Sequence, residues 1–294
     1  MRVTLWGVRG STPAPGAPFA RYGGHTTCVS VVVGDRVLVL DAGTGIRPLG
    51  RALVGRSEEL FVLLTHLHAD HVIGFPFFAP LYEDGRLVHL LDHRDEDEGS
   101  WSPLSLFDGV HYPLHPGDLP CAVRRVGGDP VAFLAEHGID LARQALNHPG
   151  GAFGYRVTHE GRSFVFIPDN ELDPPAREVD HDAIVAFCRD ADVLCHDAQY
   201  LDTEIAARRG WGHSSVAQAA ELAIEAGVRN AVLFHHDPDR TDDELDAIQA
   251  DANERLAPHD IGCTVAFEGL TFDFGNGDVV LPPPALIATK AESA

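Results

Sequence analysis

Short apolar runs, separated by glycine, proline or polar residues, recur throughout the chain. Their length and their content of β-branched residues predict strands. The predicted strands are residues 3–6, 29–33, 37–40, 60–64, 87–91, 122–126, 141–146, 155–158, 163–167, 193–195, 231–234 and 264–267. Helical periodicity appears at residues 46–54, 181–189, 214–226 and 242–256, where Ser214 or Ser215 is a candidate cap and Gly227 a candidate stop of the third helix. This pattern predicts mixed sheets flanked by helices.

We expect residues 1–280 to form one domain and residues 281–294 to form a C-terminal tail. The chain has 294 residues, of which 45% are hydrophobic, enough for a sizeable core. It shows neither an internal repeat nor a break in composition that would mark a linker. It has no segment of signal-peptide or membrane-span length, and its five cysteines are odd in number and far apart. We therefore expect a soluble, cytoplasmic protein with reduced thiols and no membrane association.

The charge balance favours small substrates. The chain carries 44 acidic and 22 basic residues, a formal net charge of -22. Such a surface repels a long polyanion on average, which disfavours nucleic acid as a partner. A pair of metal ions can reverse the potential inside one cleft, so nucleic acid stays an alternative.

A dense group of metal-binding residue types follows one of the predicted strands. Thr65 to His71 reads Thr-His-Leu-His-Ala-Asp-His, directly after the apolar run Leu60 to Leu64. The end of a buried strand holds such a turn rigidly, and neutral imidazole and carboxylate groups are good zinc ligands. We interpret this segment as a metal site rather than as a polar loop with incidental histidines.

Polar residues also follow three later apolar runs. His148, Asp169, and the pair His235 and His236 each come directly after a predicted strand. Strand ends open into a shared cleft in layered folds, so these side chains are candidate ligands. Taken singly, each is more often a turn or capping residue, but their joint order favours ligands. The pattern does not decide between His235 and His236.

The order of these residues resembles the metallo-β-lactamase superfamily. Asp41-Ala42-Gly43 after a strand is a further shared feature, and the resemblance covers residues 5 to about 274. It implies an α/β fold, a four-layer αβ/βα sandwich of two mixed β-sheets with outer helices, often assembled as a homodimer. It also implies two divalent metal ions, zinc or alternatively manganese. In this pattern one ion would be bound by His66, His68 and His148 and the other by Asp70, His71 and His235, with Asp169 bridging them.

Further segments resemble the phosphodiester-cleaving branches of the superfamily. The segments His196-Asp197-Ala198-Gln199-Tyr200 and Gly212-His213-Ser214-Ser215 look like elements of ribonuclease Z. The residues around His148, with Phe153-Gly154-Tyr155, resemble the cyclic phosphodiesterase of phosphonate breakdown. This implies hydrolysis of a small or cyclic phosphodiester by a hydroxide that bridges the metals. The alternatives are a carbonyl-ester hydrolase (lactonase or thioesterase), a tRNA 3′ processing endonuclease, and a metal-loaded binding protein without turnover.

Four residues are candidates for proton transfer. We expect His213 to protonate the leaving group or contact the phosphate, with Asp197 or His196 orienting it. Asp70 could accept a proton from the bridging water. The alternative for His213, His196 and Asp197 is a purely structural role at a helix cap and a strand end.

Two further groups of residues complete the predicted site. We expect Asp41 and Thr65 to orient imidazole ligands. We expect Arg9, Ser11 and His25, in glycine-rich loops, to contact substrate, although tight turns explain these loops equally well. Four histidines without a surrounding motif are expected to be surface or satisfied core residues: His111, His115, His137 and His159.

Overall fold

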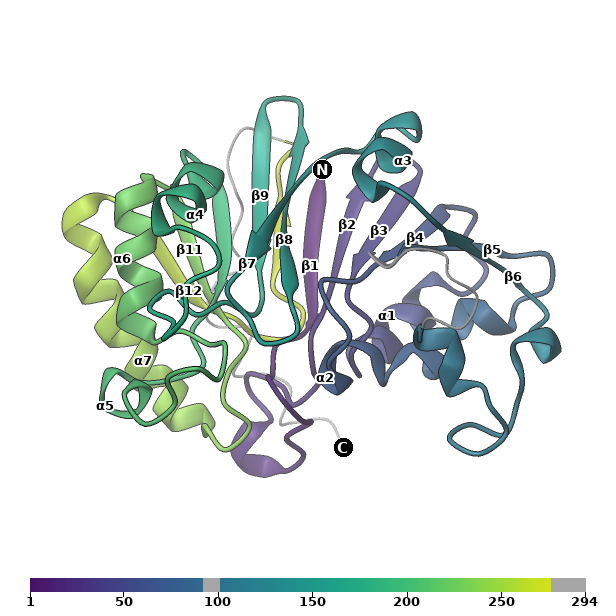
Figure 1. The fold of residues 1–294 in the computed structure, drawn as a ribbon, viewed down its shortest axis with the longest axis horizontal. Helices are drawn as coiled ribbons and strands as arrows, with labels where there is room; N and C mark the ends of the chain where they lie inside the picture. The colour runs from purple at the N-terminus through teal and green to yellow at the C-terminus, as the bar shows by residue number, and fades with distance from the viewer. Residues whose placement is uncertain (92–100, 276–294) are drawn as a thin grey trace.

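Two β-sheets lie face to face in the computed structural model, with helices on their outer faces (Figure 1). The structure describes residues 1–91 and 101–275, so the expected C-terminal tail at 281–294 lies outside the described residues. None of the helices in the described ranges is long and apolar enough to cross a lipid bilayer.

The first sheet combines an antiparallel and a parallel half. Its strand order is β13-β1-β2-β3-β4-β5-β6. The pairs from β13 to β3 are antiparallel, and those from β3 to β6 are parallel. Its strands are β1 (Arg2–Gly7), β2 (Cys28–Val33), β3 (Arg36–Leu40), β4 (Glu59–Leu63), β5 (Leu87–Leu91), β6 (Ala122–Val126) and β13 (Thr271–Asp273).

The second sheet has the order β12-β11-β10-β9-β8-β7. Its strands are β7 (Asp140–Leu146), β8 (Ala152–His159), β9 (Arg162–Ile167), β10 (Val193–Asp197), β11 (Asn230–Phe234) and β12 (Gly262–Val265). Only β8 runs against its neighbours, so β7, β9, β10 and β11 all point the same way. Their carboxyl ends therefore meet at one edge, where α/β folds place their sites.

Alternation along the strands separates the core into layers. In β4, Phe61 packs between the sheets while Val62 faces the outer helices. In β9, Phe166 packs between the sheets and Val165 faces the opposite outer layer. This alternation follows from the twofold side-chain period of a strand, and it explains why these strands read as continuous apolar runs.

Helices cover both outer faces (Figure 1). The first sheet is covered by α1 (Ile46–Leu53), and the second by α4 (His181–Cys188), α6 (Val216–Ala226) and α7 (Asp242–Leu256). Shorter helices are α2 (Ala69–Val72), α3 (Pro130–Glu136) and α5 (Asp202–Ile205), with 3-10 turns at η1 (Ala17–Phe19), η2 (Phe75–Phe77), η3 (Ala79–Tyr82), η4 (Pro103–Leu106), η5 (Pro116–Asp118) and η6 (Ala257–His259). The α6 helix begins after Ser215, whose hydroxyl accepts from Gln218 N, and ends at left-handed Gly227.

The predicted four-layer architecture is confirmed, but, apart from the 3-10 turns, the helices α2, α3 and α5 and the strand β13 were not predicted. The helix α3 begins at Pro130 after the capping residue Asp129, whose carboxylate accepts from Val131 N. This cap signal is present in the sequence, but a seven-residue helix is too short to establish a periodicity. The strand β13 has three residues and was missed for the same reason.

Candidate metal centre and active site

The candidate ligands lie at the carboxyl ends of strands from both sheets. The segment 65–71 follows β4, and its first residues lead into the short helix α2. From the second sheet, His148 follows β7, Asp169 follows β9 and His235 follows β11. The structure thus brings the seven residues of the predicted ligand pattern to one place, although they are spread over most of the chain.

The seven donors form two groups. His66, His68, His148 and Asp169 place one donor atom each within 4.8 Å of one another, and so do Asp70, His71 and His235. Ligand atoms about 2.0 to 2.2 Å from one zinc ion are separated by distances of this order. Each group therefore has the composition and spacing of a site for a divalent metal ion.

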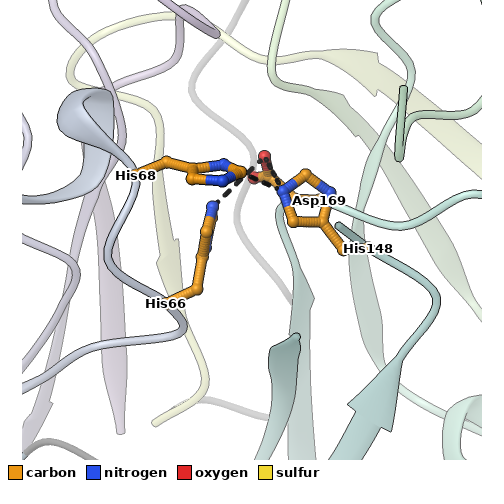
Figure 2. A group of neighbouring side chains, drawn as sticks. All are labelled: His66, His68, His148 and Asp169. Carbon is orange, nitrogen blue, oxygen red and sulfur yellow. Dashed lines mark hydrogen bonds and ion pairs between the residues drawn. The ribbon is translucent and has the colours of Figure 1, made fainter. Parts of the chain in front are cut away.

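Asp169 lies between the two groups. Its Oδ2 atom is 3.8 Å from His66 Nε2 and 3.7 Å from His148 Nε2. Its Oδ1 atom is 3.1 Å from His71 Nε2 and 3.3 Å from His235 Nε2. Figure 2 shows the three imidazoles of the first group directed at this carboxylate. One oxygen facing each group is the geometry that a carboxylate bridging two cations needs.

Unpaired polar atoms face the space between these donors. Among the described residues, His66 Nε2, His71 Nε2 and Asp169 Oδ1 are buried and have no hydrogen-bond partner. Buried polar atoms without partners cost free energy unless something binds them. Bound cations would satisfy all three atoms, so the residues present fit two divalent metal ions.

Burial and charge set the protonation of the donors. Burial lowers the pKa of His66, His68 and His148, which favours the neutral imidazole that binds metals. Burial opposes ionisation of Asp169, but the surrounding imidazoles outweigh it and hold its pKa well below the usual range. Burial also lowers the pKa of His71, but the carboxylates around it raise it well above its usual value, so a metal ion would compete with a proton there.

Asp41 and Thr65 make hydrogen bonds to two of the imidazoles. Asp41 is fully buried, and its backbone has a left-handed conformation with φ 63°. Its carboxylate accepts hydrogen bonds from His71 Nδ1 at 2.8 Å and from Thr65 N at 2.7 Å. Thr65 Oγ1 donates to Asp41 Oδ2 at 2.8 Å and accepts from His66 Nδ1 at 3.1 Å. Both Nε2 atoms are thereby left free and directed at the donor cluster.

A loop in the second half of the chain orients His148. Its Nδ1 donates to Gly212 O at 2.9 Å, and Gly212 N donates to Glu171 Oε2 at 2.9 Å. Gly212 has φ +87°, and a Cβ atom there would lie 2.3 Å from His148 Nδ1, so only glycine fits. Sequence reasoning missed Glu171, which follows a strand end closely but belongs to no recognised motif.

Of the two adjacent histidines, His235 joins the cluster. Its φ of 59° turns it toward Asp70, and Gln199 Oε1 accepts from its Nδ1 at 2.9 Å. His236 Nε2 instead donates to Ala266 O at 2.8 Å. Gln199 was overlooked, although it lies within the segment that resembles ribonuclease Z. Gly10 packs against the His235 ring, since a Cβ atom there would lie 2.5 Å from it.

His213 lies beside the donor cluster and is held by Asp197. Its Nδ1 donates to Asp197 Oδ2 at 2.8 Å, and its ring stacks on His235 with centroids 5.0 Å apart. Burial lowers the pKa of His213, but the charge and hydrogen bond of Asp197 outweigh it and raise the pKa to about 9. This pair is the arrangement of a charged imidazole positioned by a carboxylate.

The structure contradicts the predicted roles of His196 and Arg9. His196 donates from Nδ1 to Asp197 O at 2.7 Å and accepts from Asn170 Nδ2 at 3.3 Å, so Asp197 alone of the two candidates holds His213. Arg9 is fully buried, and its guanidinium donates to the carbonyl oxygens of Gly23, Asp237 and Arg240. Both side chains are committed to the interior, so His196 is not a proton-transfer residue and Arg9 is not a substrate contact.

The two other predicted substrate contacts differ in position. Ser11 N donates to Asp70 Oδ2 at 2.8 Å, which places this exposed residue beside the second donor group. His25 Nδ1 lies 3.2 Å from Thr44 Oγ1, and its backbone N donates to Glu268. The structure therefore brings Ser11 to the site and holds His25 against its neighbouring loops.

Similarity to known proteins agrees with this geometry. The model of the Beta-lactamase superfamily domain matches residues 36–236. Ribonuclease Z of Nocardia farcinica is 24% identical over 255 residues, which cover 69% of this chain and 78% of that protein. Ribonuclease Z of Gemmatimonas aurantiaca is 27% identical over 260 residues, which cover 71% of this chain and 79% of that protein.

Solved structures share the fold. The metallo-beta-lactamase fold protein YhfI from Bacillus subtilis superposes with a TM-score of 0.64 at 18% identity, covering 92% of this chain and 98% of that one. A diphosphatase from the PhnP family gives a TM-score of 0.65 at 16% identity, covering 96% and 99%. The chain therefore belongs to the beta-lactamase superfamily, as its motifs predict, and is a metal-dependent hydrolase.

Proposed function

We propose that the protein is a phosphodiesterase that acts on a small or cyclic phosphodiester. The observation that carries this proposal is the pair His213 and Asp197 beside the two donor groups. An alkoxide leaving from phosphorus needs a proton, and a positioned imidazole is a general acid suited to this task. A thioester hydrolase has less need of such a donor, because a thiolate leaves readily without one.

From the positions of the two donor groups we infer a role for each residue around them. Two divalent ions, which we propose to be zinc with manganese as the alternative, would polarise a phosphoryl oxygen and lower the pKa of a water molecule. Asp169 would hold both ions through its two oxygens. Asp70, at the second group, would in addition accept a proton, and His213 would protonate the leaving oxygen from Nε2, since its Nδ1 is bonded to Asp197.

The loop that carries His213 also offers a place for the rest of the substrate. Trp211 is 60% exposed, and the Arg208 guanidinium lies 5.5 Å from the centre of its ring and 5.0 Å from that of Tyr200. An exposed indole and a cation next to the proposed acid suit an anionic substrate with a planar group, such as a cyclic nucleotide.

A tRNA 3′ processing endonuclease is the second candidate. The relatives named Ribonuclease Z favour it. The net charge of -22 disfavours it, because binding along a polynucleotide gains free energy mainly from the release of counterions by basic residues.

Hydrolysis assays on a substrate panel test these alternatives. Metal-loaded protein is compared on bis(p-nitrophenyl) phosphate, 2′,3′-cyclic nucleotides, a lactone, a thioester and a precursor tRNA, with chelator-treated protein as the blank. We expect metal-dependent cleavage of the cyclic and activated phosphodiesters. Faster cleavage of the lactone or thioester, or specific release of a tRNA 3′ trailer, would refute the proposal in favour of the corresponding alternative.

We also propose three general properties of the protein. These are a single domain over residues 1–280, a cytoplasmic location and a homodimeric assembly. Limited proteolysis, cell fractionation and sedimentation analysis, respectively, test them.

A further inference from the structure

A third group of metal-binding residue types lies outside the active site. Glu59, His89 and His137 each place one donor atom within 4.8 Å of the others. Glu59 Oε1 is 3.4 Å from His89 Nε2 and 3.7 Å from His137 Nε2. Ligand atoms about 2.0 to 2.2 Å from a tetrahedrally coordinated zinc ion lie about 3.3 to 3.6 Å apart, so both distances are close to those of a shared ion.

The fold brings these residues together from three elements. Glu59 begins β4, His89 is the third residue of β5, and His137 is the C-cap residue directly after α3. Phe61 of β4 is in register with His89, and Glu59 is two residues away from Phe61, so all three side chains lie on the same face of the first sheet. The His89 ring stacks on Phe61 with centroids 5.0 Å apart and an interplanar angle of 14°.

The helix backbone orients His137 toward the group. Its Nδ1 donates to Phe133 O at 2.8 Å, which leaves Nε2 unprotonated and directed at Glu59. Histidine ligands of metal ions usually donate their second nitrogen in this way. The sequence gives no motif for His137, because its partners lie 48 and 78 positions away in the chain.

The buried His89 ring has no hydrogen-bond partner among the described residues. It is 2% exposed, and neither of its ring nitrogens makes a hydrogen bond to any residue in the ranges 1–91 and 101–275. A neutral imidazole can donate through one nitrogen and accept through the other, so burial of both without partners is costly. A simple ion pair between His89 and Glu59 is the competing explanation, but it does not involve His137, whose Nε2 lies 3.7 Å from the same Glu59 oxygen.

Two arginines bear on the affinity of such a site. Arg36 is in register with Glu59, and Arg124 is in register with His89 and has its guanidinium 5.9 Å from the centre of the Phe133 ring. Positive charges near a cation weaken its binding. A cation here should therefore bind more weakly than the ions of the active site, which face five histidines and two aspartates.

We propose that Glu59, His89 and His137 form a separate binding site for one divalent ion of the zinc type, with an open position for water. Two imidazoles and one carboxylate are a donor set that zinc accepts. The helix α3 connects β6, an edge strand of the first sheet, to β7, an edge strand of the second. An ion bound here would link the end of α3 to β4 and β5 of the first sheet. Its role would be to stabilise the fold, independently of hydrolysis.

Metal stoichiometry tests the proposal. Chelator-stripped protein is titrated with Zn²⁺ in the presence of a chromophoric competitor, and the bound metal is counted by mass spectrometry after gel filtration. The parent should bind a third, weaker equivalent beyond the two of the active site. His137→Gln and Glu59→Gln should each weaken that equivalent by about 100-fold or more, since even an outer partner of a metal ligand is worth 10- to 100-fold.

A matched control separates a site from a surface pair. His181 Nε2 lies 2.6 Å from Glu225 Oε2 on the second sheet's helices, so His181→Gln removes an exposed histidine and glutamate pair. This variant should keep the third equivalent. All three variants should hydrolyse phosphodiester at the parent rate, because none touches the active-site donors. A parent that saturates at two equivalents, or a His137→Gln variant that keeps the third, would overturn the proposal.

Discussion

His213 Nδ1 and Asp197 Oδ2 are 2.8 Å apart, and the backbone around Asp197 prevents this carboxylate from turning away. Asp197 Oδ2 also accepts from Asn170 N at 3.2 Å, and Oδ1 accepts from Gln199 N at 3.0 Å. A carboxylate held at both oxygens presents one fixed acceptor to His213. The imidazole is therefore positioned before any substrate binds, which lowers the entropic cost of proton transfer.

Replacing His213 should affect alkoxide leaving groups most. We expect His213→Ala to lower kcat by about 10² to 10⁴ for a substrate with an alkoxide leaving group, the usual contribution of a general acid. The loss should be much smaller with p-nitrophenolate, which leaves without a proton. Steady-state kinetics on both substrates, with metal content measured in parallel, check this. An equal loss on both substrates would assign His213 to phosphate binding instead.

Replacing Gln199 should loosen the second donor group. Gln199→Leu removes the acceptor of His235 Nδ1, and such partners are typically worth 10- to 100-fold in metal affinity or activity. Competitive metal titration should show that one equivalent is weakened. Gln144→Leu on β7, where the amide donates to Ala145 O, serves as the control and should bind metal like the parent. Equal affinities in both variants would exclude the orienting role.

Arg9 should matter for stability. Arg9→Met leaves three carbonyl oxygens without their donor and removes one of the two arginines, Arg9 and Arg21, that pair with the buried Asp242 carboxylate. We expect the free energy of unfolding to fall by about 3 to 5 kcal/mol, the usual cost of removing one partner of a buried charge. Urea unfolding measures this, with exposed Arg47→Met as a control that should change it by less than about 0.5 kcal/mol. Unchanged stability with a raised KM would restore Arg9 as a substrate contact.

His196 should make stability depend on pH. Burial lowers its pKa below the usual 6.5, and protonation would set a second N–H against the Asn170 amide. As the pH falls below about 6.5, the unfolded chain takes up a proton that the folded chain refuses, so stability decreases. In chelator-treated protein, the parent should therefore lose more stability than His196→Gln between neutral and acid pH. Parallel pH curves would contradict this.

The sequence predicted features formed by neighbouring residues, but it did not predict contacts between residues that are far apart in the chain. The segment 65–71 carries four donors in a row, so its role is visible without coordinates. Arg9 shows the reverse case, because its acceptors at Asp237 and Arg240 lie more than two hundred residues away and nothing nearby reports that its loop turns the side chain inward. His196 and Asp197 were both candidates to orient His213 because they are adjacent in the sequence. Successive residues of a strand face opposite sides, so only one of the two side chains can point toward His213.

Short elements and scattered contacts account for the other omissions. The helix α3 was not expected, so neither was the meeting of His137, its C-cap residue, with β4 and β5. Glu171 acts through the backbone of Gly210 and Gly212, and a contact of this kind leaves no pattern of residue types. The overall architecture needed no such detail, because long apolar runs and well-capped helices define it.

Each of the two active-site donor groups takes side chains from both sheets: His66 and Asp70 belong to the first, His148 and His235 to the second. Ions bound there would act as noncovalent cross-links between halves of the chain that are far apart in sequence. Because such ions bind the folded state and not the unfolded one, the melting temperature should rise steadily with the logarithm of free metal concentration above the dissociation constant. The concentration of free metal would then set the thermal stability of the protein as well as its rate of hydrolysis.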